Sequence, residues 1–195
     1  MKTNSEIFTL KCLLFQGHRD GIWDISVSRL GHPLIGTASA DKTARIWGVD
    51  SGRCLTAYVG HTGSVNSIAF HPTQDLALTA SGDGTAHIWK AAVVPERLSH
   101  ALGGGSSEES PDSESEDTDA IGNRRDSRSA IVNTIKVPII ALSGHQGVVS
   151  GCQWLNDELC VSSSWDRTAN LYNVETGALL QSLAGQYVDF EKPNL

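Results

Sequence analysis

Nearly the same nine-residue stretch occurs three times in the sequence: SADKTARIW at residues 39–47, SGDGTAHIW at 81–89 and SWDRTANLY at 164–172. Each copy is preceded by a Gly-His pair. From that glycine to the final aromatic residue there are 30, 29 and 28 positions, respectively. A unit that recurs with such constant internal spacing indicates one supersecondary structure used several times, so this stretch decides the fold class.

Short runs rich in Val, Ile, Thr and aromatic residues fill each unit, and turn signals separate them. The first unit contains GIWDISVS at 21–28, LIGTASA at 34–40 and TARIWGV at 43–49. Strands of about five to seven residues at spacings of about 8–12 residues are typical of all-β folds. Hydrophobic residues make up 39% of the chain, which is enough to build a core, and no helix of useful length is expected.

Composition excludes several classes of partner. The net charge of −7 and the lack of a basic stripe argue against binding to nucleic acid or to an anionic membrane surface. No apolar run approaches the roughly 20 residues of a membrane span, and no secretory signal is visible. The four cysteines form no CxxC pair, and neither a metal nor another cofactor is predicted. With no secretory signal, the thiols are expected to be reduced, which favours a cytoplasmic or nuclear location.

The order Gly-His, Asp and Trp, repeated near every 42 residues, resembles the WD40 β-propeller family over about residues 8–185. The resemblance implies blades of four-stranded antiparallel sheets, in repeats at about 17–59, 60–143 and 144–184. Because closed propellers have about four to eight blades, three repeats predict a partial, open propeller. Residues 1–7 are interpreted as an N-terminal extension and residues 186–195 as a tail outside the repeats.

The resemblance also implies a hydrogen-bond network in each blade, made by a histidine, a hydroxyl residue, an aspartate and an aromatic residue. An aspartate in a tight turn can accept hydrogen bonds from backbone N–H groups and from an imidazole, whose other nitrogen can meet the hydroxyl. The members are His18, Thr37, Asp41 and Trp47; His61, Thr79, Asp83 and Trp89; and His145, Ser162, Asp166 and Tyr172. In the third set a phenol replaces the indole, so the bond from the aromatic residue is not expected to be the same.

Histidine, aspartate and serine also make up hydrolase triads, so a hydrolase is an alternative interpretation of the same residues. A nucleophile needs an exposed hydroxyl and an oxyanion hole. Here the set recurs in three copies, and the second and third strands of each unit would hide its hydroxyl, so we interpret it as structural. No catalytic residue is therefore predicted.

An acidic insertion is expected within the second repeat, at residues 91–135. Residues 103–129 hold eight acidic residues and three arginines, and almost no aromatic or β-branched residues. Such a segment cannot bury enough apolar surface to offset its ordering entropy, so disorder is predicted. Four serines there lie in sequence contexts resembling those that kinases modify, and are candidate phosphorylation sites: Ser106, Ser110, Ser113 and Ser127.

Propellers of this family bind proteins and peptides on one loop face, at positions counted from the histidine and the aspartate of each repeat. Carried onto this sequence, the resemblance implies four partner-binding candidates: Trp23, Asn66, Ser150 and Trp165. Large aromatic side chains with a polar tip are favoured interface anchors. The alternative is that the tryptophans only pack on neighbouring loops.

The sequence therefore predicts a non-catalytic scaffold for protein–protein interactions. Two alternatives remain open: a truncated product without independent activity, and a hydrolase. An open set of three blades would also leave two apolar flanks exposed, which predicts self-association.

Overall fold

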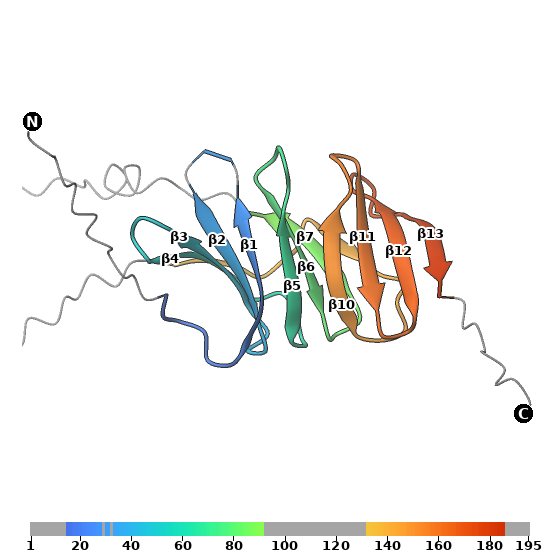
Figure 1. The fold of residues 1–195 in the computed structure, drawn as a ribbon, viewed down its shortest axis with the longest axis horizontal. Coiled ribbons are helices and arrows are strands. Elements are labelled where there is room, and N and C mark those ends of the chain that lie inside the picture. The colour runs from blue at the N-terminus through green and yellow to red at the C-terminus, as the bar shows by residue number, and fades with distance from the viewer. Residues whose placement is uncertain (1–14, 29, 32, 92–131, 186–195) are drawn as a thin grey trace, which may run out of the picture. The chain divides into compact units, whose positions relative to one another are not determined.

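The computed structural model describes residues 15–28, 30–31, 33–91 and 132–185, and all regular secondary structure in these ranges is β-strand (Figure 1). The strands form three sheets, and every pair of neighbouring strands is antiparallel except β4 and β8. The sheets stand in an open row and do not close into a ring (Figure 1). This arrangement confirms the predicted all-β fold of three sheets.

Each sheet is assembled around the strands of one repeat. Sheet 1 contains β1 (Ile22–Ser28), β2 (Leu34–Ser39), β3 (Ala44–Gly48), β4 (Cys54–Tyr58) and β8 (Asn133–Ile135), in that order. Sheet 2 contains β5 (Val65–Phe70), β6 (Leu76–Ser81), β7 (Ala86–Lys90) and β9 (Ile140–Leu142). Sheet 3 contains β10 (Val149–Trp154), β11 (Leu159–Ser164), β12 (Thr168–Asn173) and β13 (Leu179–Ala184). Sheet 2 packs against sheet 1 through β5 and β1, and against sheet 3 through β5 and β10.

The repeated nine-residue stretch forms the end of one strand, a tight turn and all but the last residue of the next strand. In sheet 1 the turn holds Asp41, whose Oδ1 accepts hydrogen bonds from the backbone N and the hydroxyl of Thr43, at 3.0 and 2.6 Å. The residue after each aspartate has a left-handed backbone, with φ of +68° at Lys42, +87° at Gly84 and +72° at Arg167. An aspartate that binds its own turn in this way fixes the hairpin, which explains why these letters recur.

Strand β8 is a difference from the predicted sheet composition. Residues 132–135 belong to the segment 91–135 for which disorder was predicted, yet Asn133–Ile135 pairs in parallel with β4, opposite Thr56–Tyr58. A further backbone bond runs from Val59 N to Ile135 O, at 2.8 Å. The prediction was wrong for these residues because β4 offers unpaired backbone groups on its outer edge, which an extended segment can satisfy. Residues 92–131 lie outside the described ranges.

A β-bulge interrupts the first strand of every sheet at the same place. These strands, β1, β5 and β10, each form one edge of their sheet and are called here the inner strands. The register shifts between Ile22 and Asp24 in β1, between Val65 and Ser67 in β5, and between Val149 and Gly151 in β10. One residue of each inner strand is therefore left without a cross-strand partner. Bulges re-aim side chains, and they occur often next to functional sites.

The core is built from the aromatic residues that end the repeated stretch and from aliphatic residues between the sheets. Trp47, Trp89 and Tyr172 are at most 1% exposed. Sheets 2 and 3 enclose one continuous cluster of buried side chains, which includes Leu78, Ile88, Leu142, Val149, Cys152 and Cys160.

Polar side chains join the inner strands of sheets 1 and 2. Asp24 Oδ2 accepts hydrogen bonds from Ser67 Oγ at 2.7 Å and from Ile68 N at 3.0 Å, and Ser26 Oγ accepts one from Phe70 N at 3.4 Å. These bonds satisfy backbone donors on the free edge of β5, which would otherwise lack a partner. Asp24 therefore contributes to the contact between two sheets.

Replacing Asp24 tests this contact. We expect Asp24→Ala to lower the free energy of unfolding by about 1–3 kcal/mol, because it leaves the hydroxyl of Ser67 and the amide of Ile68 without their acceptor. Asp20→Ala is the control, since that exposed carboxylate accepts a bond from the neighbouring Gly21 N and, among the described residues, from no other donor. Urea unfolding measured for both variants gives the comparison, and equal stabilities would contradict the assigned role.

Candidate protein-interaction surface

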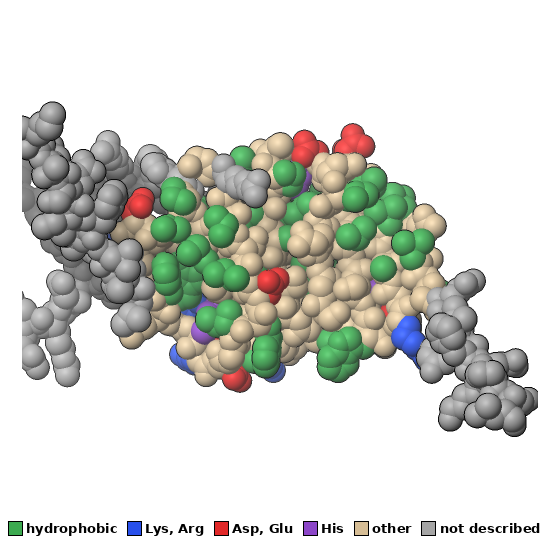
Figure 2. Space-filling view, in the orientation of Figure 1, with side chains coloured by type: hydrophobic (Ala, Val, Ile, Leu, Met, Phe, Trp, Pro, Cys, Tyr) green, Lys and Arg blue, Asp and Glu red, His purple; other side chains and the backbone are tan. Residues whose placement is uncertain are grey.

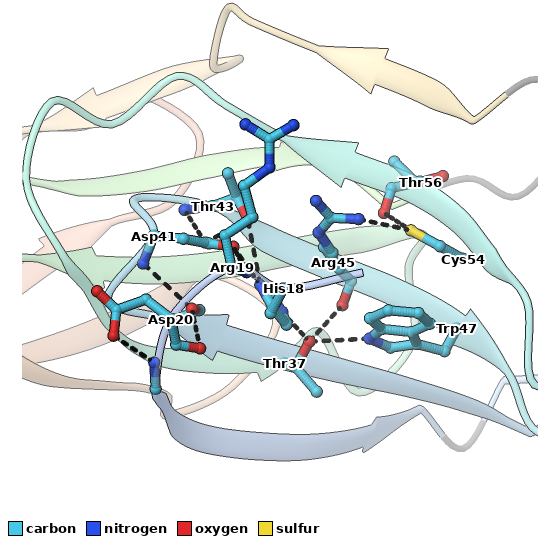
Figure 3. A network of polar contacts seen from close by, with 12 residues as sticks. His18, Arg19, Asp20, Thr37, Asp41, Thr43, Arg45, Trp47, Cys54 and Thr56 are labelled. Atoms are coloured by element: carbon cyan, nitrogen blue, oxygen red, sulfur yellow. Dashed lines mark hydrogen bonds and ion pairs between the residues drawn. The ribbon is translucent and has the colours of Figure 1, made fainter. Parts of the chain in front are cut away.

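Three polar networks lie at the end of the sheets where the strands of each repeated stretch turn. In all three, the predicted histidine is within hydrogen-bond distance of both the hydroxyl residue and the aspartate. Figure 3 shows the first network, in which His18 lies between Asp41 and Thr37. His18 Nδ1 donates to Asp41 Oδ2 at 2.9 Å, the hydroxyl of Thr37 donates to His18 Nε2 at 2.7 Å, and Trp47 Nε1 donates to Thr37 Oγ1 at 2.8 Å.

The second network has the same bonds. His61 Nδ1 donates to Asp83 Oδ2 at 2.9 Å, and His61 Nε2 lies 3.0 Å from the hydroxyl of Thr79. Trp89 Nε1 donates to Thr79 Oγ1 at 3.3 Å. The hydroxyl of Thr85 donates to Asp83 Oδ1 at 2.6 Å, so this carboxylate collects donors from the turn and from the histidine.

A group of side chains that the sequence interpretation missed extends the second network. The ring of His87 stacks on that of His61, with centroids 4.0 Å apart and planes 7° apart. Because Thr85 donates to Asp83, its oxygen accepts from His87 Nε2 at 3.2 Å. His87 Nδ1 is then the acceptor for the hydroxyl of Tyr58, at 2.8 Å, which reaches over from β4 of sheet 1. No sequence motif marks this link.

The third network departs from the other two at its aromatic residue. His145 Nδ1 donates to Asp166 Oδ2 at 2.9 Å, and the hydroxyl of Ser162 lies 2.8 Å from His145 Nε2. The hydroxyl of Tyr172 instead accepts a bond from Asn170 Nδ2, at 3.1 Å. Tyr172 keeps the buried position of the tryptophans but is bonded to Asn170.

The hydrogen bonds decide the charge of these groups. Burial alone would raise the pKa of Asp83, but the bonds from Thr85 and His61, the charge of His61 and the amide of Thr62 outweigh it and hold the pKa well below its usual range. The pKa of Asp41 is lowered against the effect of burial in the same way, by Thr43, Arg19 and His18. Burial and the adjacent His61 lower the pKa of His87 to about 4. The carboxylates are therefore charged and the stacked imidazole of His87 is neutral at pH 7.

Three of the four partner-binding candidates are the extra residues of the β-bulges. Trp23, Asn66 and Ser150 each occupy the position at which the register of the inner strand shifts. The fourth, Trp165, lies in the β11–β12 turn, where its backbone N bonds to Val148 O, just before β10, at 2.9 Å. Bulges and turns thus meet at one end of each sheet.

The two tryptophans are exposed, whereas Asn66 is tied into the structure. Trp23 is 62% exposed and Trp165 is 74% exposed. Trp23 Nε1 donates to Ser64 Oγ at 2.9 Å, Ser64 Oγ donates to Asn66 Oδ1 at 3.1 Å, and Asn66 Nδ2 donates to Val149 O at 2.9 Å. This chain of bonds runs from sheet 1 through sheet 2 to sheet 3. Ser150 is exposed and its hydroxyl faces Ser163 O at 3.3 Å.

Comparison with known proteins decides the family. The sequence pattern described as "WD domain, G-beta repeat" matches residues 9–48, 52–90 and 136–173, which is more than half of the chain. The chain belongs to the WD40 family. Each match contains the first three strands of one sheet, and the second and third matches begin with the outer strands β4 and β9 of the preceding sheet. The WD40 networks described above are the chemistry that the matched letters encode.

Several curated WD-repeat proteins are similar to this chain in sequence. WD repeat-containing protein 37 of Homo sapiens is 49% identical over 174 residues, and that of Xenopus tropicalis is 51% identical over 173 residues. The ribosome biogenesis protein WDR12 homolog of Nematostella vectensis is 29% identical over 156 residues. These matches cover 87%, 88% and 78% of this chain but 34% of each relative, so the chain spans about a third of their length.

Residues 15–28, 30–31, 33–91 and 132–185 were also compared with what a metal site or a membrane span requires. There, no group of three or more His, Cys, Asp or Glu side chains is placed to hold a metal ion. No helix among the described residues has the length and apolarity needed to cross a membrane. The four candidate phosphorylation sites, Ser106, Ser110, Ser113 and Ser127, lie outside the described residues.

The neutral His87 gives a pH-dependent stability. Its pKa in the folded chain, about 4, is below the ordinary value of 6.5, so the unfolded chain binds the proton first as the pH falls. We expect the free energy of unfolding to decline below about pH 6.5, by at most about 1.4 kcal/mol per pH unit for this one proton. His87→Gln, which keeps an acceptor for Tyr58, should flatten the decline between pH 6.5 and 4.5. Urea unfolding across this interval measures both slopes, and identical slopes would rule out His87 as the cause.

Proposed function

We propose that this chain is a non-catalytic scaffold that binds other proteins at the surface formed by Trp23, Asn66, Ser150 and Trp165, here called the loop-end surface. The observation that carries the proposal is the exposure of two tryptophan rings, at 62% and 74%, in a protein whose other described tryptophans are mostly enclosed. An exposed indole ring is unfavourably hydrated in the free protein. Covering it with a partner buries that apolar surface and so favours binding.

The geometry of Trp23 supports its use as an anchor. Its indole N–H is already bonded to Ser64, so the side chain is held in place while its ring stays exposed. A pre-positioned aromatic side chain loses little conformational entropy on binding. The bulge at this position turns the residue out of the regular alternation of β1, which gives the ring access to solvent.

The hydrolase alternative finds no support in the placement of the hydroxyl groups. Thr37, Thr79 and Ser162 are 6%, 0% and 3% exposed, and each hydroxyl is bonded to a histidine within its own network. A serine-type nucleophile has to reach its substrate and be placed beside an oxyanion hole. The networks instead act as structural links between strands and turns.

The proposal covers this chain and not the longer proteins it resembles. The match spans about a third of the human WD repeat-containing protein 37. We therefore propose binding of protein partners for this chain itself and transfer no partner from the longer protein. We include in the proposal regulation by phosphorylation at Ser106, Ser110, Ser113 or Ser127. Mass spectrometry of protein isolated from cells tests this part, and an absence of phosphate on residues 99–129 would remove it.

Substitution of the two exposed tryptophans tests the loop-end surface. We expect the double variant Trp23→Ala with Trp165→Ala to retain on the order of a tenth or less of the bound partner, because anchors of this type contribute about 2 kcal/mol or more. The melting temperature should change little, because both rings are exposed. Immobilised chain, cell extract and quantitative mass spectrometry give the readout.

Val137→Ala is the matched control for this experiment, since Val137 is 76% exposed but lies between β8 and β9, away from the loop-end surface. It should capture as much partner as the wild-type chain. A double tryptophan variant that is strongly destabilised but still binds would contradict the proposal. So would a wild-type chain that captures nothing beyond an unrelated immobilised protein.

Labelling with a serine-reactive fluorophosphonate separates the scaffold from the hydrolase. We expect no labelling of the folded chain, because the network hydroxyls are buried and bonded. Covalent labelling of Ser162 that is lost in Ser162→Ala would overturn the non-catalytic assignment. A serine hydrolase treated in parallel shows that the reagent is active.

A further inference from the structure

The two contacts between sheets are copies of one interface. In each sheet, one face carries the hydroxyl of the network and is called here the front, and the opposite face is called the back. The front of sheet 2 packs on the back of sheet 1, where a Cβ added at Gly36 would meet Ile68 and Phe70 at 2.9 and 3.0 Å. The front of sheet 3 packs on the back of sheet 2, where Leu78, at the position equivalent to Gly36, lies in one cluster with Cys152.

The front of sheet 1 has the same kind of surface but is exposed among the described residues. Counted from the histidine of each repeat, Ile25 is equivalent to Ile68 and Cys152, which are 2% and 4% exposed, yet Ile25 is 63% exposed. Val27, the next residue on this face, is 59% exposed. Figure 2 shows hydrophobic side chains gathered over the region of β1 and β2.

The back of sheet 3 is exposed in the complementary way. Leu183 pairs with Ala169 as Tyr58 pairs with Ala44 and Leu142 pairs with Ala86, so these three residues are equivalent. Tyr58 is 0% and Leu142 is 1% exposed because the next sheet covers them, whereas Leu183 is 55% exposed.

The same back face is hollowed between β10, β11 and β12. A cavity of about 230 Å³ opens beside these strands, and its lining includes Gly151, Val161 and Ala169 together with Ser67 of β5. Val161 is the equivalent of Gly36 and Leu78, the positions that contact the inner strand of the following sheet. The back of sheet 3 therefore offers room for an inner-strand side chain such as Ile25.

These two faces are the two halves of the interface that the chain already forms between its own sheets. We propose that copies of this chain associate head to tail, with the front of sheet 1 of one copy packed on the back of sheet 3 of another. A second copy is the occupant that brings both faces in the matching order, and Ile25 of one copy then lies against Val161 of the other. When both pairs of faces close, two copies make a ring of six sheets, within the range of about four to eight found in propellers.

This contact between copies is separate from the loop-end surface. Introducing a charged residue on either face tests it. Sedimentation velocity of the full chain should show a mass that doubles as concentration rises. Ile25→Glu removes the front face and Leu183→Glu removes the back face, so each variant alone should remain a monomer. Because each retains the face that the other lacks, an equimolar mixture should form a one-to-one dimer, which is followed by labelling one of the two variants.

Val137→Glu is the matched control, because it places the same charge on an exposed apolar residue away from both faces, and it should associate like the wild type. Far-ultraviolet circular dichroism checks that all three variants keep their β-structure, as expected for exposed positions. A wild-type chain that is monomeric at every concentration would overturn the proposal. Variants that still self-associate, or a mixture that forms no dimer, would overturn it as well.

Discussion

The structure depends on the hydrogen bonds that converge on one aspartate in each repeat. Asp41, Asp83 and Asp166 each accept a bond from a histidine that precedes the inner strand and from a threonine just after the turn, at 2.9 and 2.6 Å in every copy. The carboxylate thereby joins the beginning of the inner strand to the turn between the next two strands. A largely enclosed carboxylate with all of these donors fixes the local geometry, because an unpaired polar group there would be costly.

This constraint also sets the loop-end surface. Holding the histidine beside the turn places the bulge of the inner strand next to the turn of the same sheet, as the backbone bonds from Ala40 N to Gly21 O and from Trp165 N to Val148 O show. The exposed tryptophans Trp23 and Trp165 thus lie at the end of each unit that the network hydrogen bonds hold together, although both lie outside regular strand pairing. A rigid support for a few exposed side chains is what a binding surface requires.

Much of the fold was predictable because the chemistry of the networks is local to each repeat. The letters of the repeated stretch specify a strand, a turn and a strand, and their spacing from Gly-His implies the histidine partner. The bond between Tyr58 and His87 was not predictable, since it links an outer strand to the following sheet and no spacing within one repeat encodes it. Strand β8 was missed for a related reason: its partner Thr56 lies far away in sequence, and the acidic residues before it favoured disorder for the whole segment. The bulges were missed although the sequence carries a trace of them: Val65, Ile68 and Phe70 are three and then two positions apart, where unbroken alternation would space them by two.

The networks are buried by their own repeat and not by the neighbouring sheet. The side chains of His18 and Asp41 are 5% and 7% exposed although no other described sheet covers the front of sheet 1. Those of His61 and Asp83, which sheet 1 does cover, are similarly enclosed, at 0% and 11% exposed. Each unit therefore contains its own hydrogen-bond network. The contacts between units are made mainly by apolar side chains, with Asp24 and Tyr58 as polar exceptions. This separation explains how the third unit tolerates Tyr172 in place of tryptophan: its histidine, serine and aspartate keep their bonds, while the phenol fills the same apolar space. It also explains why apolar faces are what the outermost sheets present, since the polar chemistry of each unit is already satisfied within it.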